Sequence, residues 1–401
     1  MRDPDDAVRA DAAEAAVAAI DPDEVLDLVR ALIAARSENP LQTEDEAAEL
    51  AAAFLTGIGA DPEIVRGEAG RPSVVATIGD PAGPSLAWNG HLDTVPAGSP
   101  DTWSHPPFAG DVVDGRLVGR GATDMKGAIA AALVAGAALV RAGLPLAGSL
   151  AFHLAADEEL AGWHGTRVLR DRGLLTQDAC IVGEPTDLRI ALAERGGAWM
   201  TATSYGAAAH GSRPHEGVNA ITNMARFLLR LPEGLPDTIH PLCGPPTVNA
   251  ALIQGGSAPN MVPDRCVVEI DRRIVPGETS ADAVLAPFHA IVEDLRHDDP
   301  SVRIDVEVRE WTDAAESSGD SVVAALARAA IGAETGTPGL DDGFTGITDA
   351  RFYINDAAIP TIIFGPGTLA VAHAADEWVA VEDLVTAARA YARVFAGFLT
   401  A

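Results

Sequence analysis

Short apolar runs alternate with helical stretches along the first half of the chain. Apolar runs of four to eight residues bounded by turn residues are typical of buried strands. The runs with this pattern are SVVATIG, SLAWNG, SLAFHLAA and ACIVG. Helical patterns lie among them, including GAIAAALVAGAALVRAG, which ends at Gly143, and WHGTRVLRDRG. This alternation predicts an α/β fold with a mostly parallel sheet and helices on both of its faces.

Two further helices are predicted ahead of these strands. The segment DPDEVLDLVRALIAARS repeats apolar residues at helical spacing, and Asn39-Pro40 ends it. One face of this helix carries Val25, Leu26, Val29 and Leu32. The next helix, TEDEAAELAAAFLTGIG, starts with Thr43 and Glu46 at the spacing of a capping box.

The middle of the chain has a different pattern. From about Gly197 the sequence predicts strand, helix, two strands, helix and strand, which is a small α+β unit, before the sheet-like run TIIFG. We therefore predict an inserted domain at residues 197–306. It divides a larger domain into a first part, residues 1–196, and a second part, residues 307–401.

Acidic and imidazole side chains lie at the ends of the apolar runs. His91, Glu158, Glu159 and Glu184 each come directly after a predicted strand. Ligands bind beyond the carboxyl ends of strands in open parallel sheets, so these residues are expected along one edge. Two His and three carboxylates are the donors that two zinc ions take. The predicted ligand set is His91, Asp124, Glu159, Glu184 and His373.

Composition excludes several classes of function. The net charge is −30, with 28 Lys and Arg against 58 Asp and Glu, which disfavours nucleic acid and anionic membranes as partners. The three cysteines have no CxxC spacing, so they predict neither a disulfide framework nor a thiolate metal site. The acidic N-terminus does not resemble a secretion signal, and the apolar run from Ala128 is short for a membrane span. A cytoplasmic location is expected.

The motifs carry a family resemblance in their order along the chain. They are GHLDTVP, GRGATDMKGA, ADEE, GEPT, AHGSRPHEGVNAI, NMVPD, DRRIVPGE and AHAADEWV. Together they resemble the dinuclear zinc deacylase and carboxypeptidase family, which includes acetylornithine deacetylase, succinyl-diaminopimelate desuccinylase and glutamate carboxypeptidase. The resemblance runs from about residue 20 to the C-terminus and implies a zinc peptidase-like fold whose inserted domain is a lid.

The resemblance implies a role for each residue of the site. His91 and Glu184 would bind one Zn²⁺, Glu159 and His373 the other, and Asp124 would bridge the two, with Co²⁺ or Mn²⁺ as substitutes. Asp93 would orient the imidazole of His91. Glu158 would be the general base. Members of the family often have a cis peptide bond after the bridging aspartate, here Asp124-Met125.

The lid contributes a second set of implied residues. His210 resembles the family histidine that stabilises the oxyanion, often from the partner subunit of a homodimer formed through the lid. Asn260 and Arg273 resemble residues that bind the substrate carboxylate, and Arg272, facing the other way, would form a surface ion pair. A catalytic-domain loop that lines the substrate cavity would contain Gly346, Thr348 and Asp349.

The resulting hypothesis is a zinc-dependent amidohydrolase that cleaves N-acyl amino acids, like acetylornithine deacetylase or succinyl-diaminopimelate desuccinylase. Glu184 favours this hypothesis, because the family's aminopeptidases and dipeptidases more often have aspartate there. A dipeptidase or glutamate carboxypeptidase-like metallopeptidase is the first alternative. A metal-binding protein of the same fold without hydrolytic activity is the second, and the presence of Asp93 and Glu158 argues against it.

Overall fold

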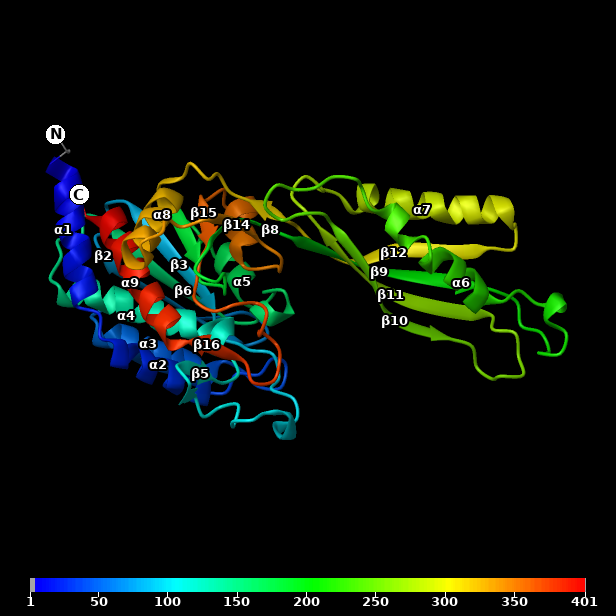
Figure 1. Ribbon diagram of the computed structural model, residues 1–401, viewed down its shortest axis with the longest axis horizontal. Helices are drawn as coiled ribbons and strands as arrows, with labels where there is room; N and C mark the ends of the chain where they lie inside the picture. The colour runs from blue at the N-terminus through cyan, green and yellow to red at the C-terminus, as the bar shows by residue number, and fades with distance from the viewer. Residues whose placement is uncertain (1–3, 401) are drawn as a thin grey trace. The chain divides into compact units, whose positions relative to one another are not determined.

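The protein has two compact units in a computed structural model that describes residues 4–400 (Figure 1). The large unit comprises the chain up to Leu192, Ser317–Phe344 and the chain from Thr348 onward. The inserted unit comprises Ala193–Glu316 and Thr345–Ile347. The sequence places the insertion at residues 197–306, and the structure extends it along a strand that ends at Thr312.

A nine-stranded sheet forms the centre of the large unit, in the order β1-β2-β6-β3-β7-β15-β8-β13, with β14 paired to β8. The four strands β6, β3, β7 and β15 are parallel neighbours, and the strands outside them pair antiparallel. The mostly parallel core predicted from the sequence is therefore confirmed. The strands are β1 (Glu63–Arg66), β2 (Pro72–Gly79), β3 (Ser85–His91), β6 (Ser149–Ala155), β7 (Ala179–Val182), β8 (Ile190–Glu194), β13 (Ala315–Glu316), β14 (Asp341–Phe344) and β15 (Thr361–Ile363).

Helices cover both faces of this sheet. On one face, Trp88 of β3 packs edge-to-face on Tyr391 of α9 (Val381–Leu399), with ring centroids 5.8 Å apart. On the other face, Leu169 of α5 (Thr166–Asp171) and Phe352 belong to one buried cluster with residues of β7 and β15. Because both faces are covered, the residues of β6 and β7 are buried without alternation, as in parallel sheets generally.

The remaining helices of the large unit are α1 (Pro4–Ala18), α2 (Pro22–Ala34), α3 (Asp45–Gly57), α4 (Gly127–Arg141) and α8 (Val322–Thr335). Helix α2 buries Val25, Leu28, Val29, Leu32 and Ile33, close to the predicted face. The capping box predicted for α3 is wrong, because the Thr43 hydroxyl donates to the carboxylate of Asp45 instead of capping the helix backbone. A small sheet, β4 (Asp111–Val113), β5 (Arg116–Val118) and β16 (Trp378–Ala380), completes the unit.

Helix α4 belongs to the buried core. Among the described residues, one helical stretch, Ala122–Arg141, is long and apolar enough to cross a membrane, and 94% of its apolar window is buried inside the protein. Gly136 lies against Phe152 of β6, where a β-carbon would come within 2.7 Å of the ring. The small residues of α4 therefore let the helix pack closely on the sheet.

The inserted unit is an antiparallel sheet with helices on one face (Figure 1). Its strands follow the order β10 (Thr247–Gly255), β11 (Arg265–Ile274), β9 (Gly196–Tyr205) and β12 (Arg303–Thr312). Helices α6 (Ala220–Leu228) and α7 (Ala281–Asp298) bury their apolar sides against it, with Phe227 and Phe288 fully inaccessible. The edge strand β10 is exposed along nearly its whole length.

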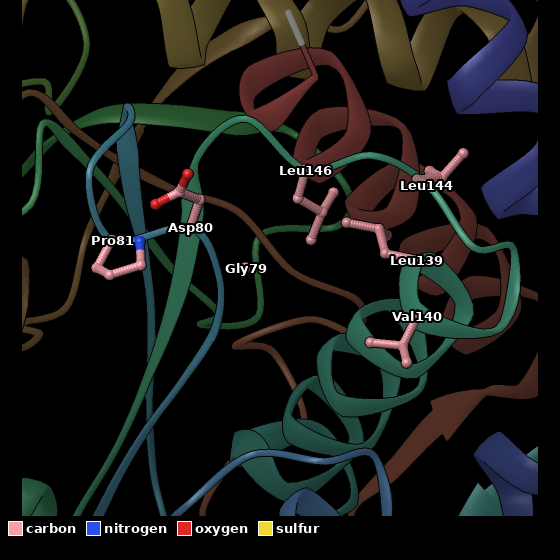
Figure 2. Close-up of a pocket in the computed structure, with 7 residues that line it drawn as sticks. All are labelled: Gly79, Asp80, Pro81, Leu139, Val140, Leu144 and Leu146. Carbon is pink, nitrogen blue, oxygen red and sulfur yellow. The ribbon is translucent and has the colours of Figure 1, made fainter.

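An open hollow lies at the edge of the large sheet where β6 begins (Figure 2). It is lined by Gly79, Asp80, Pro81, Leu139, Val140, Leu144 and Leu146. Gly79 pairs with Ser149 at the start of β6, whereas His91 pairs with Ala155 at its end. At roughly 3.3 Å per residue, about 20 Å of strand separates the hollow from the strand ends that carry the predicted site.

Replacing Tyr391 with phenylalanine tests the packing of α9 on the sheet. The buried Tyr391 hydroxyl donates to the carbonyl of Phe364 at 2.6 Å, and the variant removes that donor. The free energy of unfolding in urea should fall by about 1–3 kcal/mol. Tyr205→Phe, at a side chain that is 39% exposed, is the matched control and should leave it unchanged. Equal free energies of unfolding for the two variants would show that the Tyr391 hydrogen bond does not stabilise the core.

Candidate metal centre

The parallel strands bring the predicted ligands to one edge of the large sheet. His91 is the last residue of β3, and it pairs with the last residue of β6. Glu158 and Glu159 follow β6 in a short turn, Glu184 follows β7, and His373 lies in the loop after β15. The strand ends coincide because β3, β6, β7 and β15 run parallel beside one another.

Asp124 lies between the two histidines. It belongs to the turn Ala122–Lys126 that leads into α4, and its Oδ1 is 2.9 Å from Nε2 of His91. Its Oδ2 is 3.2 Å from Nε2 of His373, which is also 3.0 Å from Oε2 of Glu159. Oε1 of Glu184 is 3.7 Å from Nε2 of His91. The two oxygens of one carboxylate thus face two imidazoles, as a bridging ligand requires.

The donors lie close enough together to share metal ions. Two donors that bind one Zn²⁺ at about 2.0–2.2 Å in a tetrahedron lie roughly 3.3–3.6 Å apart. His91, Asp124 and Glu159 place ligand atoms within 4.8 Å of one another, and so do His91, Glu158 and Glu184. The two groups share His91, and His373 approaches Asp124 and Glu159, so the two imidazoles and the carboxylates of this one cluster fit a pair of divalent cations in number and chemistry. Their individual roles as ligands stay predictions.

The charges of the cluster are unbalanced. Burial, together with nearby carboxylates, raises the pKa of Glu158 and of Glu184 well above the ordinary value, and raises that of Glu159. Hydrogen bonds to Asp124 and Glu159 raise the pKa of His373 to about 10. So many acidic groups out of bulk water are stable only when protons or cations neutralise them.

His91 is oriented through its second nitrogen. Nδ1 is 3.0 Å from the backbone carbonyl of Asp93 and 3.5 Å from the Asp93 carboxylate. Donation from Nδ1 to these oxygens leaves Nε2 directed at Asp124, which is the orientation that a metal ligand needs. The family resemblance assigns this orienting role to the Asp93 carboxylate. In the structure, the backbone carbonyl of Asp93 lies nearer to Nδ1 of His91 than the carboxylate does.

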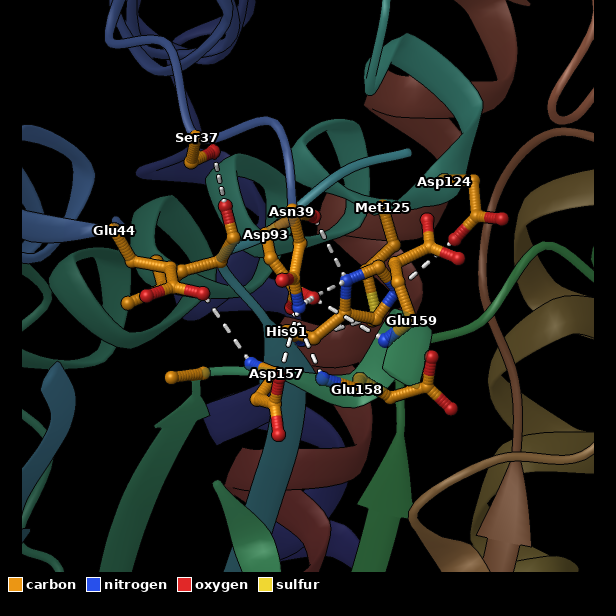
Figure 3. A network of polar contacts seen from close by, with 12 residues as sticks. Ser37, Asn39, Glu44, His91, Asp93, Asp124, Met125, Asp157, Glu158 and Glu159 are labelled. Carbon is orange, nitrogen blue, oxygen red and sulfur yellow. Dashed lines mark hydrogen bonds and ion pairs between the residues drawn. The ribbon is translucent and has the colours of Figure 1, made fainter. Parts of the chain in front are cut away.

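The Asp93 carboxylate also supports the turn that carries both glutamates (Figure 3). Its oxygens accept hydrogen bonds from the backbone N–H of Glu158 at 3.1 Å and of Glu159 at 3.2 Å. Asp157 and Ala161, on either side of this turn, have φ angles of 61° and 72°. The strand therefore ends in a tight turn, and adjacent glutamates can both contribute to the cluster.

Two buried residues outside the predicted set support the site. Oε1 of Glu377 accepts the backbone N–H of Thr123 at 2.9 Å and of Asp124 at 3.1 Å, and its other oxygen pairs with Arg120. The amide of Asn39 donates to Asp93 on the other side of the cluster. Glu377 stands in the quoted motif AHAADEWV, and Asn39 stands before Pro40, five residues beyond the end of α2. Spacing alone does not reveal their contacts, since the partners lie far away in sequence.

The predicted residues of the inserted unit fall into two groups. His210 and Met261 form an isolated bridge, and the N–H of Gly211 donates to the carbonyl of Asn260 at 2.7 Å, so His210 and Asn260 are neighbours. They adjoin the end of the sheet where Arg265 begins β11. Arg273 lies eight residues further along β11, about 27 Å away at 3.4 Å per residue. The structure does not bring Arg273 and Asn260 together within this unit.

Arg272 differs from its prediction as a surface residue. It faces the helix-covered side of the sheet, where its side chain is 1% exposed and pairs with Glu278. Arg273 faces the opposite side, and its Nε is 3.0 Å from Asp271. Adjacent residues of a strand point to opposite faces, which is why the two arginines have different surroundings.

The loop predicted to line the substrate cavity is partly buried. Thr348 is fully buried, and its hydroxyl accepts the N–H of Ala350 at 3.0 Å. Asp349 is 1% exposed and accepts the Thr166 hydroxyl at 2.6 Å. Gly346 is half-buried and belongs to the inserted unit. Contact of Gly346 and Thr348 with substrate stays a prediction.

The sequence pattern of Peptidase family M20/M25/M40 matches residues 87–396, which is more than half of the chain. The protein belongs to this family. The chain is 33% identical over 338 residues to a succinyl-diaminopimelate desuccinylase of Rhodospirillum centenum, covering 80% of this chain and 83% of that protein. This M20 protein is therefore a hydrolase of a metal-dependent family, as the resemblance implied.

Solved structures show the same fold at low sequence identity. The aminopeptidase PepT of Bacillus cereus has a TM-score of 0.77 at 21% identity, over 95% of this chain and 99% of that chain. A dinuclear metal-binding M20 peptidase of Bacillus subtilis has a TM-score of 0.70 at 18% identity, over 94% and 97%. The cis peptide bond Asp124-Met125 expected from the family is also present.

Binding of Zn²⁺ to metal-free protein should release protons at pH 7.5. With a pKa of about 10, His373 carries a proton there that it must lose to become a ligand. The apparent affinity should therefore rise about tenfold per pH unit for each proton released. Titration calorimetry in buffers of different ionisation enthalpy counts these protons.

The matched variants are His373→Gln and His105→Gln. His373→Gln removes a predicted ligand and should release about one proton fewer than wild type. His105 lies outside the cluster, near Asp111, and its replacement should change nothing. Identical proton counts for His373→Gln and wild type would remove His373 from the metal centre.

Proposed function

We propose that this M20 hydrolase is a dinuclear zinc amidohydrolase that cleaves the amide bond of N-acyl amino acids. The observation that carries the proposal is the position of Asp124, whose two carboxylate oxygens face His91 and His373 separately. The turn that holds Glu159 also presents Glu158, a carboxylate with a raised pKa. A metal-binding protein without hydrolytic activity would not need this additional acid.

Two divalent ions held by the five predicted ligands would polarise the amide carbonyl and lower the pKa of a bound water. Glu158 then takes the proton of the attacking water and delivers it to the departing amine. The direction of its pKa shift suits both steps, because burial makes this carboxylate a stronger base than an ordinary glutamate. Asp93 and Glu377 keep the neighbouring turns in place during this exchange.

The orientation of His210 supports its role as an oxyanion donor. The backbone N–H of Ser212 donates to Nδ1 of His210 at 3.1 Å, so Nδ1 is the unprotonated nitrogen. Nε2 then carries the hydrogen and can donate to the developing negative charge of the tetrahedral intermediate. For the substrate carboxylate we propose Arg273, whose guanidinium lies on the open face of its sheet.

The substrate class is inferred from the relatives and from Glu184. A relative at 33% identity is named succinyl-diaminopimelate desuccinylase, which favours a deacylase and a dicarboxylic acyl group or amino acid. A dipeptidase or carboxypeptidase is the second candidate, because PepT and other structural neighbours are peptidases. The three cysteines are free and buried, which suits the cytoplasmic location proposed for such an enzyme.

Glu158→Gln should abolish turnover without removing the metals. We expect kcat on the best substrate of a panel of N-succinyl, N-acetyl and N-formyl amino acids and dipeptides to fall about 10²- to 10⁴-fold. The metal content should stay near two ions per chain. Glu68→Gln, at an exposed glutamate, is the control. A wild-type protein without turnover on any member of the panel, and indistinguishable from Glu158→Gln, would contradict hydrolysis.

We also propose that the enzyme is a homodimer formed through β10 of the inserted unit. This edge strand has unpaired backbone groups, and Leu252 and Ile253 are 68% and 61% exposed. Pairing with the β10 of a second copy would extend the sheet and cover these side chains. Since His210 and Asn260 adjoin the end of the sheet remote from Arg273, we propose that they serve the partner's active site.

Mixed dimers test this arrangement. Glu158→Gln and His210→Ala should each be nearly inactive alone, and mixing them in equal amounts should restore about a quarter of wild-type activity. Half of the dimers would be mixed, and each mixed dimer would combine one intact Glu158 with one intact His210. Leu252→Glu, introduced into wild type, should give monomers in sedimentation experiments. If the mixture stays inactive while dimers exchange, His210 acts within its own chain.

A further inference from the structure

A buried amide links the loop after β3 to the turn after β6 beside the site. Asn39 is 3% exposed and follows α2, far in sequence from every predicted ligand. Its Nδ2 donates to Oδ2 of Asp93 at 3.0 Å and to Oδ1 of Asp157 at 2.9 Å (Figure 3). An amide nitrogen has two hydrogens, so both are used, one on each carboxylate.

The orientation of this amide is determined by its partners. The reverse orientation would place the Asn39 carbonyl oxygen against two carboxylates, which accept hydrogen bonds and cannot donate. Oδ1 of Asn39 is buried and has no hydrogen-bond partner. The two hydrogen bonds that Nδ2 donates therefore account for an asparagine at this buried position, because the unpaired Oδ1 is itself unfavourable there.

Each of the two carboxylates controls a different part of the site. Asp93 faces His91 and accepts the backbone N–H groups of both Glu158 and Glu159. Asp157 begins the turn that carries these glutamates, and its second oxygen accepts the N–H of His164 at 3.0 Å. Asn39 thus links the loop after β3 to the turn after β6 at the point where both reach the metal centre.

Arg71 lies near Asp157 but does not link it to Asp93. Nε of Arg71 is 3.8 Å from Oδ1 of Asp157, and its hydrogen bond at 3.0 Å goes to Glu44. Glu44 in turn accepts the N–H of Asp157 at 3.3 Å. Arg71 and Glu44 therefore support Asp157 from behind, and Asn39 supplies the direct link between Asp157 and Asp93.

We propose that Asn39 is a positioning residue of the hydrolytic site, whose amide sets the relative positions of Asp93 and Asp157 and thereby orients His91 and Glu158. This inference rests on the proposed function for its kinetic consequence. Its consequence for the metal centre is independent of turnover, because the geometry of the bound ions depends on His91 and Glu159 whether or not substrate is cleaved.

Asn39→Asp is the main test, because it keeps the shape of the side chain and replaces the donor with an oxygen. Three buried carboxylates then meet at high pH, whereas protonation of the introduced carboxyl group at lower pH restores one donor. We expect kcat to fall about tenfold or more at pH 8, with KM changed less than about twofold. The ratio of variant to wild-type kcat should rise as the pH is lowered from 8 to 5.5. The visible spectrum of the Co²⁺-loaded protein should change at pH 8.

Asn39→Ala is the second variant, because it removes the amide without adding a charge. It should also lower kcat and change the Co²⁺ spectrum, but its ratio to wild type should not depend on pH. Asn223→Asp is the matched control, since Asn223 is a buried asparagine, 5% exposed, in α6 of the inserted unit. It should leave the Co²⁺ spectrum and the pH dependence of kcat unchanged, whatever it does to stability.

The outcomes separate this inference from the proposed function. If wild type hydrolyses nothing in the panel, the proposed function fails, and the Co²⁺ spectra of the Asn39 variants still test the positioning role. The inference is overturned if folded Asn39→Asp or Asn39→Ala has the kcat and the Co²⁺ spectrum of wild type. It is also overturned if the variants lose only thermal stability, as a residue with a purely structural role would.

Discussion

The parallel alignment of β6, β3, β7 and β15 is the constraint on which the metal centre depends. Residues almost 300 positions apart in sequence, from His91 to His373, become neighbours because four strand ends coincide at one edge of the sheet. Apolar side chains on both faces hold this alignment, with Trp88 packed on Tyr391 on one side. A change that tilted one strand would move its ligand away from the others, so the geometry of the site depends on the packing of the core.

The same alignment creates an electrostatic problem at the edge. It gathers carboxylates whose pKa values rise on burial and leaves two imidazoles between them. Cations that bind here relieve this repulsion. Their affinity is highest when the ligand side chains are already held in place, because immobilising each side chain on binding costs free energy. Glu377 and Asp93 meet this requirement by accepting the backbone N–H groups of Asp124 and Glu159. The supports thus act on the turns that carry the ligands.

Local pattern was sufficient to predict the α/β class, several of the helix and strand segments and the residues that gather at the strand ends. It was sufficient because burial on both faces leaves continuous apolar runs, and each run ends at a polar residue. It could not predict the contacts of Asn39 or Glu377, whose partners are up to 257 residues away. The capping box at Thr43 failed for a local reason, since the carboxylate of Asp45, two residues away, accepts the hydrogen bond of the Thr43 hydroxyl.

The supports also bear on where the substrate preference of the proposed enzyme would reside. Around His91 and Asp124, hydrogen bonds to Asp93, Glu377 and Asn39 occupy the buried polar groups, which leaves this part of the site little freedom to adapt to different acyl groups. The inserted unit instead presents groups with fewer fixed contacts, the exposed His210 near one end of its sheet and the half-buried Arg273 near the other. On the proposed function, the supported metal centre would act on the amide bond itself, and differences in the inserted unit would select among substrates.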